Sequence, residues 1–398
     1  MKRSTTTRLL TLALGCSALM LTAMKAGEAA GEPVKVFILA GQSNMEGKAA
    51  ASTLKAVIDD APDDPQLKHL MRDGKWTTRD DVWVTFLCRS DKQATEHARK
   101  YGPLSVGFGS QKQTRDDDNR RVAVPGVGPE LGIGHVLGDH FDQQVLLIKA
   151  AWGGRSVKYN FRSPGGMPTE EQLQKQLAEL KARKPELDEE QWKAGFGQSY
   201  RDMIAEVRKV TGDIKQYFPD YDPAQGYEIA GLIWFQGWND GVGGGNPDYV
   251  QQLAALIRDV RKEFSVPKMP VVIGELGTDG LDAEGWIATF RAQQAAAAAL
   301  PEFRGNVRLA KTAQFWPNPP DLSQQWEAFR TQAKANESKP KDDPTRIDPG
   351  DFYFKNWVQR YRKELAYTSD KRYHYLGSGK CYYQMGEAMG QAMVELLK

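Results

Sequence analysis

The stretch Val34-Lys-Val-Phe-Ile-Leu-Ala-Gly-Gln-Ser-Asn-Met45 decides the fold expected for this chain. Residues 34–40 form a short apolar run rich in β-branched side chains, which is typical of a strand buried on both faces of a sheet. Gly41 then begins a tight turn that places Ser43 where the strand passes into a helix. Such a turn exposes a serine hydroxyl and sets a backbone N–H where an oxyanion can form. If the pentapeptide Gly41–Met45 stood alone, Ser43 would be better interpreted as a helix N-cap.

Four further runs of the same kind follow along the chain, at 145–150, 229–235, 270–275 and 306–312. Helical patterns separate them. Apolar residues recur at three-four spacing between Asn246, the predicted N-cap, and Phe264; a second helix is predicted for 129–141 and a last one around 385–396. Strands that alternate with helices predict a parallel sheet of about five strands covered on both faces, a three-layer α/β/α sandwich.

Three polar stretches interrupt this alternation, at about 49–127, 159–225 and 317–350. The second contains a charged segment, 170–184, that is predicted to be helical. Because none of the three shows a core pattern of its own, we interpret them as insertions that decorate a single domain spanning residues 31–398.

The first thirty residues are predicted to be a signal peptide. A positive start precedes the apolar stretch Leu9–Met24, which is shorter than the ~20 residues of a membrane-spanning helix, and small residues follow it. The pattern favours export to the periplasm or the medium and no integral span after cleavage. An uncleaved anchor and lipid attachment at Cys16 are the alternatives. Of the remaining cysteines, Cys88 and Cys381 either pair in an oxidising compartment or are two buried thiols.

Charge and histidine spacing exclude several classes of function. The chain has 53 basic and 51 acidic residues, so a nucleic acid or an anionic membrane is not an expected partner. The five histidines are scattered, and no His-Glu-x-x-His motif is present. We therefore expect no metal and no other cofactor.

Chemistry-bearing residues follow the predicted strands, at the edge where parallel sheets bind ligands. The run at 145–150 is followed by Trp152-Gly153-Gly154-Arg155, where glycines allow backbone to approach a substrate. The run at 229–235 is followed by Gln236, a side-chain amide donor. Near the C-terminus, His374 offers the imidazole that a serine nucleophile needs as its base.

Together these motifs carry a resemblance. Residues 41–45, the Gly128-Pro129-Glu130 motif, the glycine pair, Trp234-x-Gln236-Gly237 and His374 resemble the SGNH-hydrolase superfamily, more narrowly carbohydrate esterase family 6 and sialate O-acetylesterase-like proteins. The ordered match spans about 34–157 and 229–397. It implies a flavodoxin-like sandwich and an esterase that removes O-acetyl groups from a carbohydrate.

The resemblance also implies roles for individual residues. Ser43 would be the nucleophile and His374 its base, while the Ser43 amide, the Gly154 amide and the Gln236 side chain would form the oxyanion hole. Glu130 would support the site. We expect the substrate to be contacted by five residues, namely Gln42, Asn44, Trp152, Arg155 and Trp238.

Two positions depart from the family pattern. The aspartate usually found three residues before the histidine is replaced by Lys371, so either Asp370 or a backbone carbonyl orients His374. Trp238 replaces a glutamate, which we expect to change substrate preference. A catalytically silent carbohydrate-binding protein and a lipase or thioesterase are the alternative functions, and the identity of the sugar and the oligomeric state stay open.

Overall fold

The computed structural model describes residues 31–88, 99–115, 120–317 and 323–398. The predicted signal peptide, with Cys16, lies outside these residues. Its strands are β1 (Val34–Gly41), β2 (Ala49–Ala50), β3 (Met71–Arg72), β4 (Lys75–Trp76), β5 (Arg79–Leu87), β6 (Arg99–Leu104), β7 (Gly109–Arg115), β8 (Arg121–Val127), β9 (Val145–Ala151), β10 (Tyr227–Phe235), β11 (Val271–Gly274) and β12 (Val307–Ala310). Its helices are α1 (Ser43–Glu46), α2 (Ala51–Asp60), α3 (Glu130–His140), α4 (Glu170–Arg183), α5 (Glu189–Gly195), α6 (Gln198–Gly212), α7 (Ile214–Tyr217), α8 (Trp238–Gly241), α9 (Tyr249–Glu263), α10 (Gly285–Ala298), α11 (Ser323–Glu337), α12 (Pro349–Tyr353) and α13 (Gly379–Leu397).

A central sheet of seven strands organises the molecule, in the order β12-β11-β10-β1-β9-β5-β6. All five strands predicted from apolar runs are present and parallel, with β1 between β10 and β9. The sheet is larger than predicted because β5 joins it parallel to β9 and β6 adds an antiparallel edge. The three-layer α/β/α prediction is confirmed.

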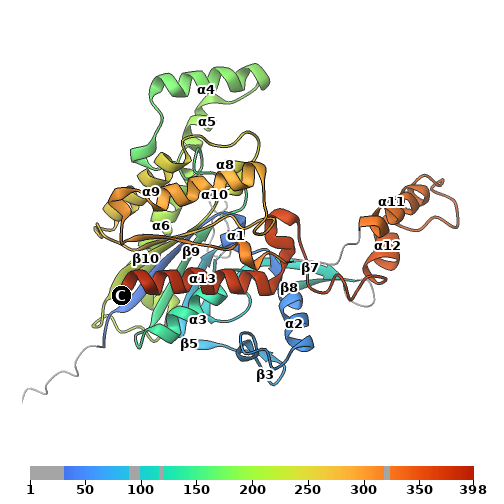
Figure 1. Cartoon of the computed structure of the whole chain (residues 1–398), viewed down its shortest axis with the longest axis horizontal. Coiled ribbons are helices and arrows are strands. Elements are labelled where there is room, and N and C mark those ends of the chain that lie inside the picture. Colours follow the sequence, from blue (N-terminus) through green and yellow to red (C-terminus); the bar gives the residue numbers. More distant parts are fainter. Residues whose placement is uncertain (1–30, 89–98, 116–119, 318–322) are drawn as a thin grey trace, which may run out of the picture.

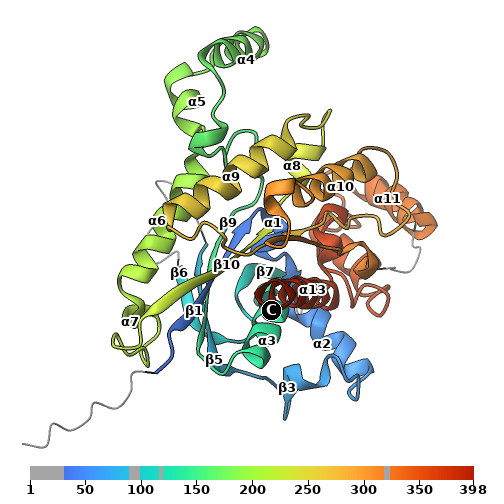
Figure 2. The same ribbon diagram turned by 60° about the vertical axis from the view of Figure 1, so that its left-hand side comes forward.

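Helices cover both faces of the sheet (Figures 1 and 2). The alternate side chains Val36 and Ile38 of β1 face a core shared with α6 and α9. Phe37 and Leu39 face the opposite core, which α3 and α13 cover. This alternation follows from the two-residue repeat of a strand, and its burial on both sides explains why β1 is continuously apolar.

Two of the three predicted insertions are partly incorrect. The stretch 49–127 contributes β5 and β6 to the central sheet, and β2, β8 and β7 form a second, antiparallel sheet. In the stretch 159–225, α4 is the predicted charged helix, but α6 buries Met203, Val207 and Val210 against the sheet. These segments are therefore part of the core structure.

Residues 323–350 of the third predicted insertion lie in an outlying lobe. Helices α11 and α12 project from the body of the protein (Figure 1). Their aromatic side chains pack on one another, with Trp326 against Phe329 and Trp357 at ring distances of 5.2 and 4.7 Å. The lobe thus has a small aromatic core of its own, separate from the sheet.

The prediction for the start of α9 was wrong by two residues. Asp248 stands at the N-cap position, and the Asn246 side chain instead donates to Asp240 and Gln252.

In the described ranges, no helix combines the length and the apolar character that crossing a bilayer would require.

Candidate active site

Ser43 lies at the carboxyl end of the central strand β1, at the first residue of α1. Gly41 makes this turn possible: its φ is +148°, and a Cβ there would lie 2.1 Å from the carbonyl oxygen of Phe235 on β10. Only glycine allows the two backbones to approach so closely. The Ser43 side chain is 5% exposed, and its amide is the first of the helix, which has no intrahelical acceptor.

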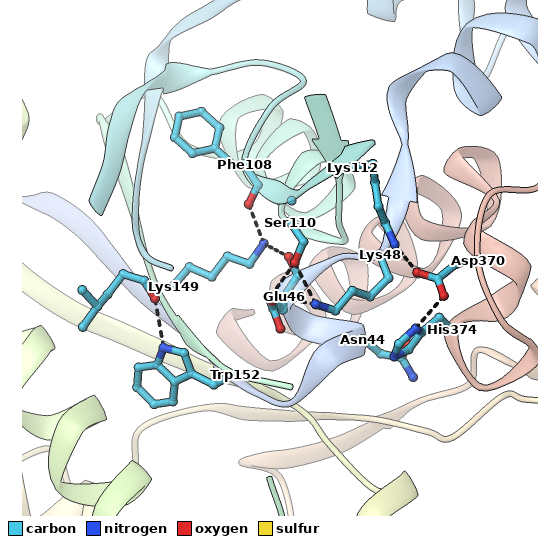
Figure 3. Close-up of polar contacts among 12 residues, drawn as sticks. Asn44, Glu46, Lys48, Phe108, Ser110, Lys112, Lys149, Trp152, Asp370 and His374 are labelled. Atoms are coloured by element: carbon cyan, nitrogen blue, oxygen red, sulfur yellow. Dashed lines mark hydrogen bonds and ion pairs between the residues drawn. The ribbon is translucent and has the colours of Figure 1, made fainter. Parts of the chain in front are cut away.

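Asn44 joins this turn to the C-terminal segment. Its Nδ2 donates to the carbonyl oxygen of Tyr373 at 3.2 Å, and its Oδ1 accepts from the Tyr382 hydroxyl at 2.8 Å. The residue after Ser43 therefore contacts the residue before His374; Figure 3 shows Asn44 close to His374. Since Asn44 is 2% exposed and both ends of its amide are bonded, it ties the site together; the predicted contact with substrate is not supported.

His374 has an aspartate partner. Its Nδ1 lies 3.1 Å from Oδ1 of Asp370, whose other oxygen pairs with Lys112 (Figure 3). Burial raises the pKa of Asp370, but the hydrogen bonds from His374 and Lys112 outweigh it and hold that pKa below its ordinary value. The carboxylate, and not a backbone carbonyl, is thus the group that contacts the imidazole.

A tight turn allows Asp370, four residues before His374, to reach the imidazole ring. The carbonyl oxygen of Leu376 accepts from the amides of Ser369 and Asp370, while Tyr375 and Leu376 have φ values of +50° and +54°. The left-handed pair folds the chain back, so that Asp370 faces the His374 ring. Within the described residues, no hydrogen bond joins the Ser43 hydroxyl to this ring.

The glycine pair lies beside Ser43. A Cβ on Gly153 would lie 3.7 Å from the Ser43 Cβ, and Gly154 has a φ of +73° with open space around its Cβ position. The Gly154 amide makes no hydrogen bond to any described residue. It is therefore free to donate to a group bound over Ser43.

Two predicted substrate contacts are instead supports. Trp152 is 4% exposed, donates its Nε1 to the Leu87 carbonyl oxygen at 3.0 Å and belongs to the core. Gln42 is 2% exposed; its Oε1 accepts from the Gly237 amide, and its Nε2 donates to Asn239 Oδ1 at 3.0 Å. Both side chains are buried and bonded within the protein, so they support the site and do not form its surface.

Gln236 is also engaged by the protein. Its Nε2 lies 2.7 Å from Asp240 Oδ2, 3.1 Å from the Arg155 carbonyl oxygen and 3.1 Å from Gln42 Oε1. An amide nitrogen carries only two hydrogens, so none is left for an oxyanion. The predicted donor role of Gln236 conflicts with this geometry.

Asn239 carries a side-chain amide that the sequence analysis did not consider. Its Oδ1 accepts from Gln42, which turns its Nδ2 the other way, and that nitrogen has no partner among the described residues. Asn239 is half-buried at the same sheet edge. The sequence places Asn239 two residues after Gly237, close to the end of the predicted strand 229–235, so its amide could have been considered as a donor from the sequence alone.

Lys149 links Glu130 to the end of α1, and Figure 3 shows Lys149 beside Glu46 and Phe108. Lys149 Nζ donates to Glu130 Oε2 at 2.6 Å, to the Glu46 carbonyl oxygen at 2.8 Å and to the Phe108 carbonyl oxygen at 2.9 Å. Burial lowers the pKa of Lys149, and the Glu130 carboxylate opposes that shift. The pair thereby anchors the end of α1, which carries Ser43.

Aromatic rings form the wall beside His374. Trp238 lies 5.3 Å from the Tyr373 ring and 5.0 Å from the Trp286 ring, and Tyr373 lies 4.4 Å from His374. Tyr373 and Trp286 are 39% and 36% exposed. Trp286 and Tyr373 thus join the predicted residue Trp238 in a partly exposed ring cluster.

Cys88 and Cys381 are both free thiols, so the disulfide considered above is absent. Across the described ranges, no three His, Cys, Asp or Glu side chains are grouped as metal ligands.

These groups lie at the carboxyl edge of a mostly parallel sheet, where α/β proteins bind their ligands. Residues 33–307 match the family model for carbohydrate esterase, sialic acid-specific acetylesterase. This is more than half of the 398 residues, so the chain belongs to that family and is a carboxylic ester hydrolase acting on carbohydrate.

Solved structures give more distant likenesses. An Arabidopsis thaliana protein is 15% identical, with a TM-score of 0.41 over 73% of this chain and 89% of its own. A carbohydrate acetylesterase from Xanthomonas citri is 17% identical, with a TM-score of 0.42 over 72% of this chain and 52% of its own. NanS is 13% identical, with a TM-score of 0.39 over 74% and 82%. No curated protein sequence matches significantly.

Proposed function

We propose that the protein removes O-acetyl groups from a carbohydrate by an acyl-enzyme mechanism in which Ser43 is the nucleophile. The observation that carries this proposal is the Asp370–His374 contact of 3.1 Å on a segment bonded to the neighbour of Ser43. His374 takes the serine proton through Nε2, since its Nδ1 faces the carboxylate. Asp370 holds that tautomer and stabilises the imidazolium that forms.

The oxyanion is held by two backbone amides and one side chain. Among the described residues, nothing accepts from the Ser43 and Gly154 amides, and Asn239 Nδ2 takes the donor role that the resemblance implied for Gln236. The Ser43 oxygen attacks the acetyl carbon, the sugar oxygen leaves with the proton from His374, and water then releases acetate. Catalytic hydrogen bonds are often long in a free enzyme and shorten when substrate binds, which accommodates the unbonded Ser43 hydroxyl.

The ring cluster of Trp238, Tyr373 and Trp286 is proposed to contact the sugar that carries the acetyl group. Its rings are partly exposed beside His374 and offer flat apolar faces. Trp238 occupies the position where carbohydrate esterase family 6 members have a carboxylate, so this wall is apolar in the present chain.

We further propose that residues 1–30 direct export, which N-terminal sequencing of the mature protein tests.

A fluorophosphonate probe tests the nucleophile directly. We expect one labelled peptide containing Ser43, no labelling of Ser43→Ala, and loss of aryl acetate hydrolysis in that variant. Ser338→Ala, on the outlying lobe, is the matched control and keeps both properties. Labelling at another residue, or hydrolysis by Ser43→Ala at the parental rate, would exclude the mechanism.

The same assays separate the alternatives. A catalytically silent binding protein would show neither labelling nor turnover. A lipase or thioesterase would hydrolyse long acyl chains, whereas an acetylesterase prefers acetyl over longer esters. Acyl-chain profiling with aryl esters from acetate to decanoate distinguishes them.

A further inference from the structure

A carboxylate lies on the same side of α1 as Ser43. Glu46 is the last residue of this four-residue helix, three positions after Ser43, and side chains at this spacing share one face of a helix. The Glu46 side chain is 13% exposed, so it borders the site without projecting into solvent. The mechanism proposed above gives this carboxylate no part.

One oxygen of the carboxylate is held by the protein. Glu46 Oε1 accepts from Lys48 Nζ at 2.7 Å and from the Ser110 hydroxyl, and Lys48 Nζ also donates to Ser110 Oγ at 2.9 Å (Figure 3). The main chain is fixed as well, because the Glu46 carbonyl oxygen accepts from the buried Lys149. These bonds orient the carboxylate. The positive charge of Lys48 also reduces the repulsion between Glu46 and the oxyanion that forms at Ser43.

The second oxygen of Glu46 faces the glycine pair. A Cβ on Gly153 would lie 3.3 Å from Glu46 Oε2 and 3.7 Å from Ser43 Cβ. Because residue 153 has no side chain, this space between the carboxylate and the nucleophile is open. Gly153 is exposed, and no described residue donates a hydrogen bond to Oε2. Since both oxygens of an ionised carboxylate accept hydrogen bonds, Oε2 is available to a donor from outside the protein.

The position of Oε2 restricts the kind of donor. The acetyl carbon of the substrate must lie against the Ser43 hydroxyl, and the sugar oxygen that leaves is bonded to this carbon. In a partly acetylated sugar, the donors nearest to that oxygen are the hydroxyl groups on the neighbouring ring carbons. Such a hydroxyl can enter the space beside Gly153 while the ester lies over Ser43. Its hydrogen bond to a carboxylate would be charge-assisted and therefore stronger than one between neutral groups.

We propose that Glu46 is a specificity-determining residue that accepts a hydrogen bond from the hydroxyl next to the acetylated oxygen, so that the enzyme prefers acetyl groups with a free neighbouring hydroxyl. The proposal rests on the esterase function above and specifies which acetyl groups of a carbohydrate are removed. An acetyl group whose neighbouring oxygens carry no hydrogen is removed more slowly.

The test compares two monoacetylated methyl glucosides that differ at one position. The oxygen next to the acetyl ester carries a hydrogen in one compound and a methyl group in the other. The kcat/KM of the parent enzyme should be about tenfold higher for the hydroxyl compound, because only this compound can donate to Oε2.

Glu46→Gln should abolish this preference. Lys48 can only donate, so it keeps the amide oxygen at the position of Oε1. The amide NH2 then faces Gly153 and offers a donor to either compound, whose oxygens both accept. The ratio of the two kcat/KM values should therefore fall about tenfold, to near one. A merely structural Glu46 would lower both values equally and leave the ratio unchanged.

Two further variants separate recognition from support. Ser110→Ala removes a donor to Oε1 but keeps the carboxylate, so it is the matched control and should retain the parental ratio. Gly153→Ala places a methyl group between Oε2 and Ser43 and should lower the ratio, as Glu46→Gln does. An equal fall of the ratio in Ser110→Ala and Glu46→Gln would overturn the proposal.

The two levels of the proposal fail in different ways. Absence of p-nitrophenyl acetate hydrolysis by the parent enzyme would overturn the esterase function itself. With that hydrolysis intact, equal kcat/KM values for the two glucosides in the parent enzyme would overturn the role of Glu46 alone. An unchanged ratio in Glu46→Gln or in Gly153→Ala would do the same.

Discussion

Replacing Asp370 with asparagine tests the candidate triad most sharply. The substitution keeps the shape of the side chain, but Lys112 can only donate and therefore binds the new amide oxygen. The amide NH2 is then turned toward His374 Nδ1, which lies 3.1 Å from the present carboxylate oxygen. That nitrogen must become the acceptor, which moves the ring proton to Nε2 and prevents it from taking the Ser43 proton.

The expected loss in kcat is roughly 10³- to 10⁴-fold, because the wrong tautomer in a serine–histidine–aspartate triad costs about 10⁴ and Asp370 is partly exposed here. KM should change little, since Asp370 contacts no substrate. Hydrolysis of p-nitrophenyl acetate at pH 7 to 8 measures both constants. Adding Lys112→Met to Asp370→Asn should recover part of the activity, because the amide is then free to rotate and present its oxygen to Nδ1.

Asp279→Asn is the matched control. Asp279 also holds the same segment, through an ion pair with Arg372, but it does not contact the imidazole. Its loss should leave kcat within a few-fold of the parent. The reasoning fails if Asp370→Asn keeps more than a fifth of the parental kcat, or if both asparagine variants lose activity equally.

Three further predictions concern the oxyanion donor and the folded state. Asn239→Ala should lower kcat by about 10²- to 10³-fold, and Gln236→Ala should mainly lower the melting temperature; the reverse result would restore our original assignment. Lys149→Met should cost about 3–5 kcal/mol in urea unfolding because it strands a buried carboxylate, and adding Glu130→Leu should return part of that loss. Burial lowers the pKa of His135 to about 4, so the folded state holds this imidazole neutral while the unfolded chain binds a proton below about pH 6.5. The free energy of unfolding should therefore fall by at most about 3 kcal/mol as the pH falls from about 6.5 toward 4. In His135→Gln, the free energy of unfolding should lack this dependence on pH.

The parallel core was predictable because its strands are buried on both faces and therefore read as apolar runs. β6 was not, since it is an edge strand with Arg99 and Lys100 in its first two positions. β5 begins Arg-Asp-Asp inside a polar stretch, which concealed its buried half. The three-four pattern of Met203, Val207 and Val210 on α6 was legible in the sequence and was overlooked.

For the site, the sequence offered Asp370 as a partner of His374, which the structure shows, but it did not indicate the hydrogen bonds that occupy the Gln236 amide. Ser43 and His374 were candidates because a serine hydrolase needs a nucleophile and a general base. Which amide stays free depends on three-dimensional distances, so the exchange of Gln236 for Asn239 required coordinates. Lys149 left a visible signal, a lone charge in an otherwise apolar strand, which usually means that a buried partner exists.

The hydrogen bonds from Asn44 to Tyr373 and from Tyr382 to Asn44 span 329 and 338 positions of the chain. A polypeptide emerging from the ribosome therefore contains Asn44 early, yet cannot bond it to the segment that carries His374 until that segment and α13 have been synthesised and have docked. Each doubling of such a loop adds only about 0.6 kcal/mol to its closure, so the long separation delays assembly without greatly weakening it. Ester turnover should consequently return last during refolding, after tryptophan fluorescence and helicity, and measures the fraction of molecules whose two ends have met.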